Sequence, residues 1–130
     1  MVYLLYTKSA EITEVVIWSL LALLLVLANI WDINQDWLHI AAQKVEQARD
    51  FMDKGQHLPA TECLEQALKF NPANFEAIVV RGELYRMELD YDNARKELFR
   101  ANDINPKSFR VHFALGLTFL QEKKVLEAKS

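Results

Sequence analysis

The side chains that could carry out chemistry are few, and none of them stands at a reactive spacing. The three glycines are isolated from one another, so the chain has no glycine-rich loop for phosphate groups. The sequence also lacks GxSxG, HExxH and paired CxxC motifs. His57 and Cys63 are six residues apart with Pro59 between them, which is not the spacing of two metal ligands on one helix. We therefore expect no catalytic residues, no metal site, no cofactor and no enzyme activity.

The overall composition excludes several other classes of protein. The chain has 130 residues, of which 52% are hydrophobic and 25% are charged, so it can form one small domain and is not a disordered tail. Its net charge is −3 and it has no basic patch, which argues against a nucleic-acid partner, and nothing indicates a small-molecule substrate. A single cysteine excludes a disulfide framework. Three Gly and three Pro are too few for the turns of an all-β chain, so we predict an all-α fold.

An uncharged apolar segment lies near the N-terminus. Residues 15–31 (VVIWSLLALLLVLANIW) would span roughly 25 Å as a helix, or about 30 Å when counted from Ile12. That length matches the hydrocarbon core of a bilayer. Trp18 and Trp31 lie near the ends, where indole rings favour the headgroup region, and Leu21 and Leu24 lie between them. We predict a single transmembrane helix at about residues 12–31, within an N-terminal segment of residues 1–35.

Two other interpretations of this segment stay open. It could be the buried helix of a soluble protein, although such a helix is rarely apolar on every face. It could be a cleaved secretory signal, because Val26 and Ala28 suit a cleavage site, although one Lys and two Glu precede the segment. Lys8 is the only base on its N-terminal side, and we favour the non-cytoplasmic side for the rest of the chain. Ser9 is the expected N-cap of the first helix, and any break is expected at residues 32–36.

The remaining residues repeat with a period of 34. Small residues, aromatic residues and Asn-Pro pairs coincide when the segment from Ala41 is shifted by that period. The aligned sets are Ala48, Gly82 and Gly116; Phe51, Tyr85 and Phe119; Ala60, Ala94 and Ala128; Leu64 and Leu98; Ala67 and Ala101; and Asn71-Pro72 and Asn105-Pro106.

Each repeat is predicted to be a helical hairpin. In the second repeat the first helix is expected at about Phe75–Glu88 and the second at about Tyr91–Asp103. The aligned small residues on the two helices would meet and allow a close approach. Gly55 marks a tight turn, and a proline ends each second helix. Because one hairpin cannot cover its own apolar face, the hairpins must stack.

This combination of spacing and residue size resembles the tetratricopeptide repeat. The resemblance covers Ala41–Ser130 and implies a helical-hairpin solenoid at residues 36–130, which follows the transmembrane helix predicted from the apolar segment. The repeats are expected at about 41–74, 75–108 and 109–130, which gives two full repeats and the first helix of a third. The third repeat is expected to place Ala128 about one turn into its second helix. Since Phe109–Leu120 is apolar on all sides, we expect further repeats or another protein to cover it.

In tetratricopeptide domains the first helix of each repeat lines a concave groove that binds peptides or helices. The resemblance therefore implies a partner-binding groove along one face of each first helix. Its expected residues are Val45, Arg49, Met52 and Asp53, then Val79, Glu83, Arg86 and Met87, then Arg110, Phe113, Leu117 and Leu120.

One subclass of this family clamps a C-terminal carboxylate with basic and amide side chains. The clamp positions in this sequence would be Val45, Arg49, Val80, Arg110 and Ala114. Three of these five residues are apolar, so we expect the groove to take an apolar or amphipathic segment rather than an acidic tail.

Together these patterns predict a membrane-anchored scaffold for protein–protein interactions. The resemblance to anchored tetratricopeptide proteins implies a small subunit or assembly factor of a multiprotein membrane complex, in a bacterial inner membrane or an organellar membrane. Its partners would be integral or membrane-associated proteins, and the lipid bilayer through the N-terminal helix. A membrane-anchored chaperone for translocated proteins and the non-catalytic front end of a longer enzyme are the alternatives that the sequence leaves open.

Overall fold

The computed structural model describes residues 1–130 and is all-helical, as predicted. Its five helices are α1 (Val2–Asp53), α2 (His57–Phe70), α3 (Phe75–Met87), α4 (Tyr91–Ile104) and α5 (Phe109–Lys129). The chain divides into two compact units, Met1–Asp36 and Trp37–Ser130.

The first unit is an uninterrupted stretch of α1. The helix begins at Val2, so Ser9 is not its N-cap, and the Ser9 hydroxyl instead donates a hydrogen bond of 2.7 Å to the Tyr6 carbonyl. The expected break at residues 32–36 does not occur, because Asp and Asn are tolerated inside a helix and no Gly or Pro precedes Gly55. All the large apolar side chains from residue 12 to residue 30 are exposed within the chain.

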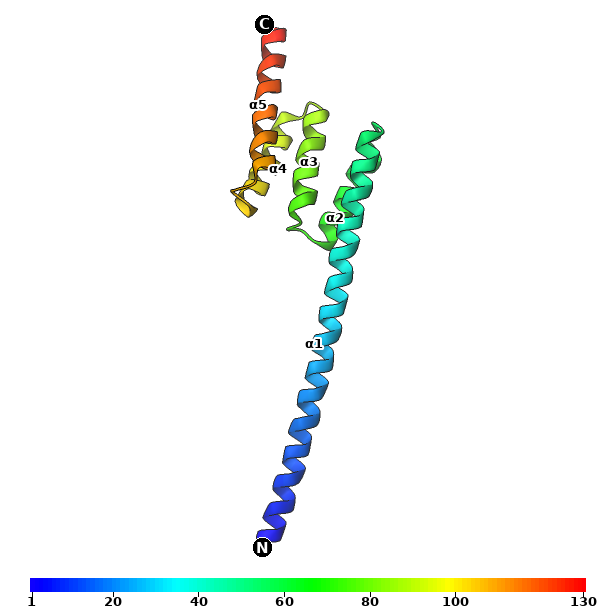
Figure 1. The fold of residues 1–130 in the computed structure, drawn as a ribbon, viewed down its shortest axis with the longest axis vertical. Coiled ribbons are helices and arrows are strands. Elements are labelled where there is room, and N and C mark those ends of the chain that lie inside the picture. Colours follow the sequence, from blue (N-terminus) through cyan, green and yellow to red (C-terminus); the bar gives the residue numbers. More distant parts are fainter. The chain divides into compact units, whose positions relative to one another are not determined.

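Helical hairpins form the second unit, and their short turns recur in the predicted register. Gly55 lies in the turn between α1 and α2 with a φ of 70°, a left-handed conformation that favours glycine. Leu89 lies 34 residues later, in the turn between α3 and α4, and adopts a φ of 63°. Figure 1 shows α3, α4 and α5 running in alternating directions. Both predicted helices of the second repeat are confirmed to within one residue at each end.

Side-chain caps fix the helix ends. Asn74 and Ser108 occupy equivalent positions before α3 and α5, and the side-chain oxygen of each accepts a hydrogen bond from the amide three residues later, at 3.0 and 3.4 Å. Asp90 caps α4 in the same way at 3.2 Å. Pro72 and Pro106 follow the ends of α2 and α4, which confirms that they terminate these helices.

The hydrophobic core of the second unit lies between the paired helices. Its largest fully buried apolar side chains are Leu64, Ile78, Val79, Val80, Leu84, Leu98 and Val111. α3 and α4 approach each other closely at Gly82, because a Cβ atom added there would lie 2.8 Å from Cγ of Leu98. The predicted close approach at Gly82 is confirmed, with the Leu98 side chain as the nearest group and the Ala94 carbonyl oxygen at 3.5 Å, whereas Ala101 is not among the nearest atoms.

α5 differs from the prediction for the third repeat. It continues as one helix from Phe109 to Lys129, so the expected turn is missing and Ala128 does not belong to a second helix. Lys123 and Lys124 stand where Leu89 and Asp90 form the turn and the N-cap in the second repeat. Without a capping aspartate, nothing in this stretch favours a turn over a helix. The second unit therefore contains two hairpins followed by a single helix.

Candidate functional site

A small pocket opens on the first helices of the three repeats. Its volume is about 260 Å³, and it is lined by Arg49, Met52 and Asp53 of α1, Val80 and Glu83 of α3, and Arg110 of α5. Met52 and Val80 give it an apolar floor, and the other four side chains are charged. The pocket thus combines an apolar surface with charged groups of both signs.

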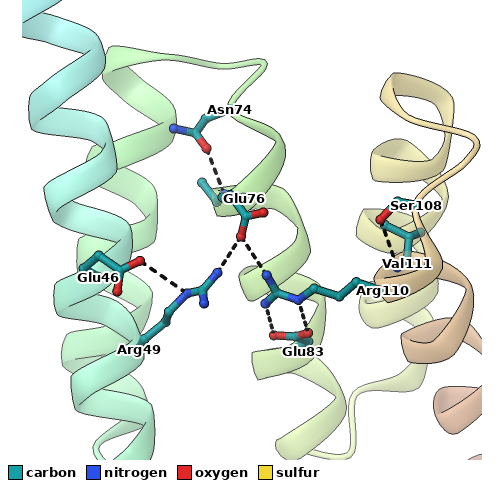
Figure 2. Close-up of polar contacts among 9 residues, drawn as sticks. Glu46, Arg49, Asn74, Glu76, Glu83, Ser108, Arg110 and Val111 are labelled. Carbon is teal, nitrogen blue, oxygen red and sulfur yellow. Dashed lines mark hydrogen bonds and ion pairs between the residues drawn. The ribbon is translucent and has the colours of Figure 1, made fainter.

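An ion-pair network bridges the three helices at this pocket (Figure 2). The Arg110 guanidinium donates two hydrogen bonds to the Glu83 carboxylate, at 3.1 and 2.8 Å. A third Arg110 nitrogen donates to Oε2 of Glu76 at 2.7 Å, and Arg49 donates to the same oxygen at 2.5 Å. The network links α1 and α5 to α3 around the pocket.

Most of the charged side chains at the pocket have a partner of opposite charge, and one does not. The hydrogen bonds with Glu83, reinforced by the charges of Glu83 and Glu76, raise the pKa of Arg110 above its ordinary value, although partial burial opposes that shift. Both arginines are engaged with carboxylates, whereas Asp53 makes no hydrogen bond or ion pair with another side chain. Two guanidinium groups face the carboxylates of Asp53, Glu76 and Glu83, so the site carries one net negative charge.

The period of 34 residues relates the charged positions of this network to one another. Glu76 and Arg110 occupy the same position in successive repeats, and so do Arg49 and Glu83. Stacked repeats place equivalent positions side by side, which accounts for the pair of Glu76 and Arg110. The pairs Arg49–Glu76 and Glu83–Arg110 join residues 27 apart, and the second pair is the equivalent of the first in the next repeat. Glu76 was missed by the sequence analysis, although the reversal of charge between equivalent positions was a signal that could have identified it.

Two predicted groove residues lie in the core rather than on the surface. Val45 is 2% exposed and Val79 is fully buried, and both belong to the hydrophobic cluster of the second unit. Their side chains cannot contact a partner, so their assignment to the groove is corrected. Arg49, Met52, Glu83 and Arg110 are brought together at the pocket, as is Asp53.

The remaining predicted groove residues lie outside the pocket. Arg86 donates a hydrogen bond of 3.0 Å to Gln121 of α5, and Leu117 is half-buried. Met87 is exposed near the end of α3. Phe113 and Leu120 are exposed on α5, 56% and 50%, but do not line the pocket.

Cys63 and His57 have separate surroundings in the structure. Cys63 is buried in α2, and the ring of His57 lies 3.5 Å from the Glu88 carboxylate. No group of three or more His, Cys, Asp or Glu side chains is arranged to hold a metal ion.

The fold is similar to that of a solved structure, the second TPR of Spaghetti (RPAP3) bound to HSP90 peptide SRMEEVD. The TM-score is 0.64 with 20% sequence identity, and the match covers 75% of this chain and 90% of that chain. At this level of identity the likeness shows the fold alone, which is an arrangement of tetratricopeptide-like helical hairpins. No protein-family model matches the sequence, and no curated protein matches it.

Proposed function

We propose that this chain is a membrane-anchored scaffold for protein–protein interactions, acting as a small subunit or assembly factor of a multiprotein membrane complex. The observation that carries the proposal is the pocket on a tetratricopeptide-like fold, built from three helices that an ion-pair network links. The similar RPAP3 domain binds a peptide of a partner protein, which supports a role in binding proteins rather than in catalysis.

Support for the membrane anchor comes from the exposed apolar surface of α1. The helix is long and apolar enough to cross a bilayer, and none of its most apolar window is buried within the chain. Residues 15–31 carry no charged group, so a bilayer would accept the whole segment without the cost of burying a charge. A signal sequence has the same length and composition, which is why the anchor needs a direct test.

The charges in the pocket define which partner segment fits it. The RPAP3 domain takes the peptide SRMEEVD, which contains three acidic residues. In this chain Arg49 and Arg110 are already held by Glu76 and Glu83, and Asp53 is the unpaired charge. The pocket therefore suits a segment that places an apolar side chain on Met52 and Val80 and a lysine or arginine beside Asp53.

Extraction of membranes with alkaline carbonate tests the anchor. A chain that spans the bilayer stays in the membrane pellet, because carbonate releases only proteins held by surface contacts. Release of the full-length chain into the supernatant would contradict the anchor, and a shortened mature chain would identify the segment as a signal.

Affinity purification from gently solubilised membranes tests the scaffold. We expect a defined, stoichiometric set of membrane proteins with the wild type, and loss of at least one of them with Asp53→Lys. Glu65→Lys, which reverses an exposed acid on α2 outside the pocket, is the matched control. A broad, substoichiometric spread of exported proteins would instead identify an anchored chaperone.

A further inference from the structure

One face of α5 carries large exposed apolar side chains outside the pocket. It consists of residues spaced three or four apart along one side of the helix, and every one of them is exposed. They are Phe109, His112, Phe113, Gly116, Phe119, Leu120, Lys123 and Lys124. We call this set the α5 stripe. Its apolar residues are large, and an exposed helix face of this kind is typical of an interface.

Comparison of the three repeats shows that the residues equivalent to Phe113 of the α5 stripe are covered in the first two repeats. Val45, Val79 and Phe113 occupy equivalent positions, and they are 2%, 0% and 56% exposed. The position is therefore core in the two repeats whose second helix the structure describes, and it is open on α5. By contrast Val111 and Ala114, on the side of α5 away from the stripe, are buried like the equivalent residues of α3.

Gly82 and Gly116 show the same difference between the second and third repeats. At Gly82 an added Cβ would meet Leu98 of α4 at 2.8 Å, so the leucine fills the space that the missing side chain leaves. At the equivalent Gly116 nothing lies within 4 Å of an added Cβ. Gly116 thus has open space at the point where Leu98 packs in the preceding repeat.

From this comparison we propose that the α5 stripe binds an amphipathic helix of a partner protein that lies antiparallel to α5 and places a leucine against Gly116. The pattern that fits is the one on α4, where Leu98 has Ala94 and Ala101 on the same face. The proposal concerns residues outside the pocket and does not depend on the partner of that pocket.

Charge favours a partner helix over a second copy of α5. The stripe ends in Lys123 and Lys124, and Lys124 forms no ion pair. The N-terminal end of an antiparallel helix would lie beside these lysines, and acidic residues are favoured there both by the lysines and by the helix dipole. A second copy of α5 in antiparallel orientation would place its His112 and Phe113 beside these lysines, and neither residue is acidic.

Residues 109–130 form no turn at the position where the first two repeats turn into their second helix. α5 passes straight through Lys123 and Lys124, which are equivalent to the turn residues Leu89 and Asp90, and remains helical to Lys129. The region beside the turn position is therefore free for the end of a helix from another molecule.

A stapled, fluorescent peptide with the sequence of residues 90–105 is the probe for this surface, because it carries the α4 pattern. Its binding to the full-length chain in lipid nanodiscs is measured by fluorescence anisotropy, with empty nanodiscs as the blank. We expect saturable binding that weakens about tenfold or more when the leucine of the peptide is replaced by alanine. We expect a similar loss with Gly116→Leu, which fills the open space beside residue 116.

Leu58→Asp is the matched control, since it alters a 73% exposed leucine on α2 and should leave the affinity unchanged. Absence of saturable binding would overturn the proposal. So would binding that persists with Gly116→Leu, because the peptide would then be replacing α4 against Gly82. A dimer of the wild type that Phe113→Asp converts to a monomer would also overturn it, by showing that the stripe binds a second copy.

Discussion

The contrast between the two helical glycines leads to a quantitative prediction. Replacing either Gly82 or Gly116 by alanine favours the helix by about 1 kcal/mol, because alanine loses less backbone entropy than glycine. At Gly82 the new methyl group would lie 2.8 Å from Cγ and 2.9 Å from Cδ2 of Leu98. Leu98 is fully buried, so it cannot move into solvent, and overpacking of this kind costs about 1–3 kcal/mol.

The expected results follow from these two opposing effects. Gly82→Ala should change the free energy of unfolding by between zero and about 2 kcal/mol, in the destabilising direction. Gly116→Ala, with nothing within 4 Å, should stabilise the protein by about 1 kcal/mol. The difference between the variants, about 1–3 kcal/mol, isolates the overpacking at Leu98 because the helix propensity is common to both.

Urea denaturation of the full-length chain in one detergent, followed by far-ultraviolet circular dichroism, measures both variants. A double-mutant cycle with Leu98→Val attributes the effect to the contact, since the smaller side chain should remove part of the cost of Gly82→Ala. If Gly82→Ala were as stable as Gly116→Ala, the close approach of α3 and α4 at this point would be wrong, and so would the interpretation of Gly116 as an open position.

The remaining predictions concern a turn, an ion-pair network and a helix cap. Leu89→Gly should stabilise the protein by about 1 kcal/mol in thermal melts, because glycine adopts the positive φ of this turn without strain, while Gly55→Ala should destabilise it by a similar amount. Arg110→Gln should lower stability by about 1 kcal/mol at low salt and by less at high salt, because its ion pairs are partly exposed. Since the pKa of Arg110 is raised above an ordinary value that is already far above neutral, its contribution is present at every pH below that value and is lost only above it. The difference between wild type and Arg110→Gln should therefore be equal at pH 7 and pH 10, and a decline by pH 10 would contradict the assignment. Asp90→Ala should destabilise the protein by about 1 kcal/mol in urea titrations through loss of the α4 cap, whereas an unchanged midpoint would show that the cap is not needed.

The helices of the second repeat were predictable from sequence because local signals determine them. A capping aspartate begins α4, a proline follows its end, and the period of 34 residues repeats the proline at the equivalent point of α2. The same local reasoning identified the turn at Gly55. It was wrong for the third repeat, where the period was extended to Ala128 although Lys124 replaces the capping aspartate.

The pocket was only partly predictable, because exposure depends on contacts between distant residues. Arg49, Glu83 and Arg110 were identified from the repeat register, and the structure brings them together. Val45 and Val79 belong to the same set of predicted groove residues but lie in the core. Whether such a residue is buried or exposed depends on how the paired helices pack. Sequence alone gives the repeat position of a residue but not the depth at which it lies.

The alternation of charge between equivalent positions limits how this protein can change in length. Duplication of residues 75–108 would put a second copy of Glu76 at the position that Arg110 now occupies, so Glu76 and Glu83 would be repelled there by a carboxylate where the Arg110 guanidinium now attracts both. Exchange of the first and second repeats would likewise separate the charges that now pair. The order of the repeats is therefore encoded in their surface charges as well as in the chain, and a longer array could arise only if compensating substitutions accompanied each added repeat.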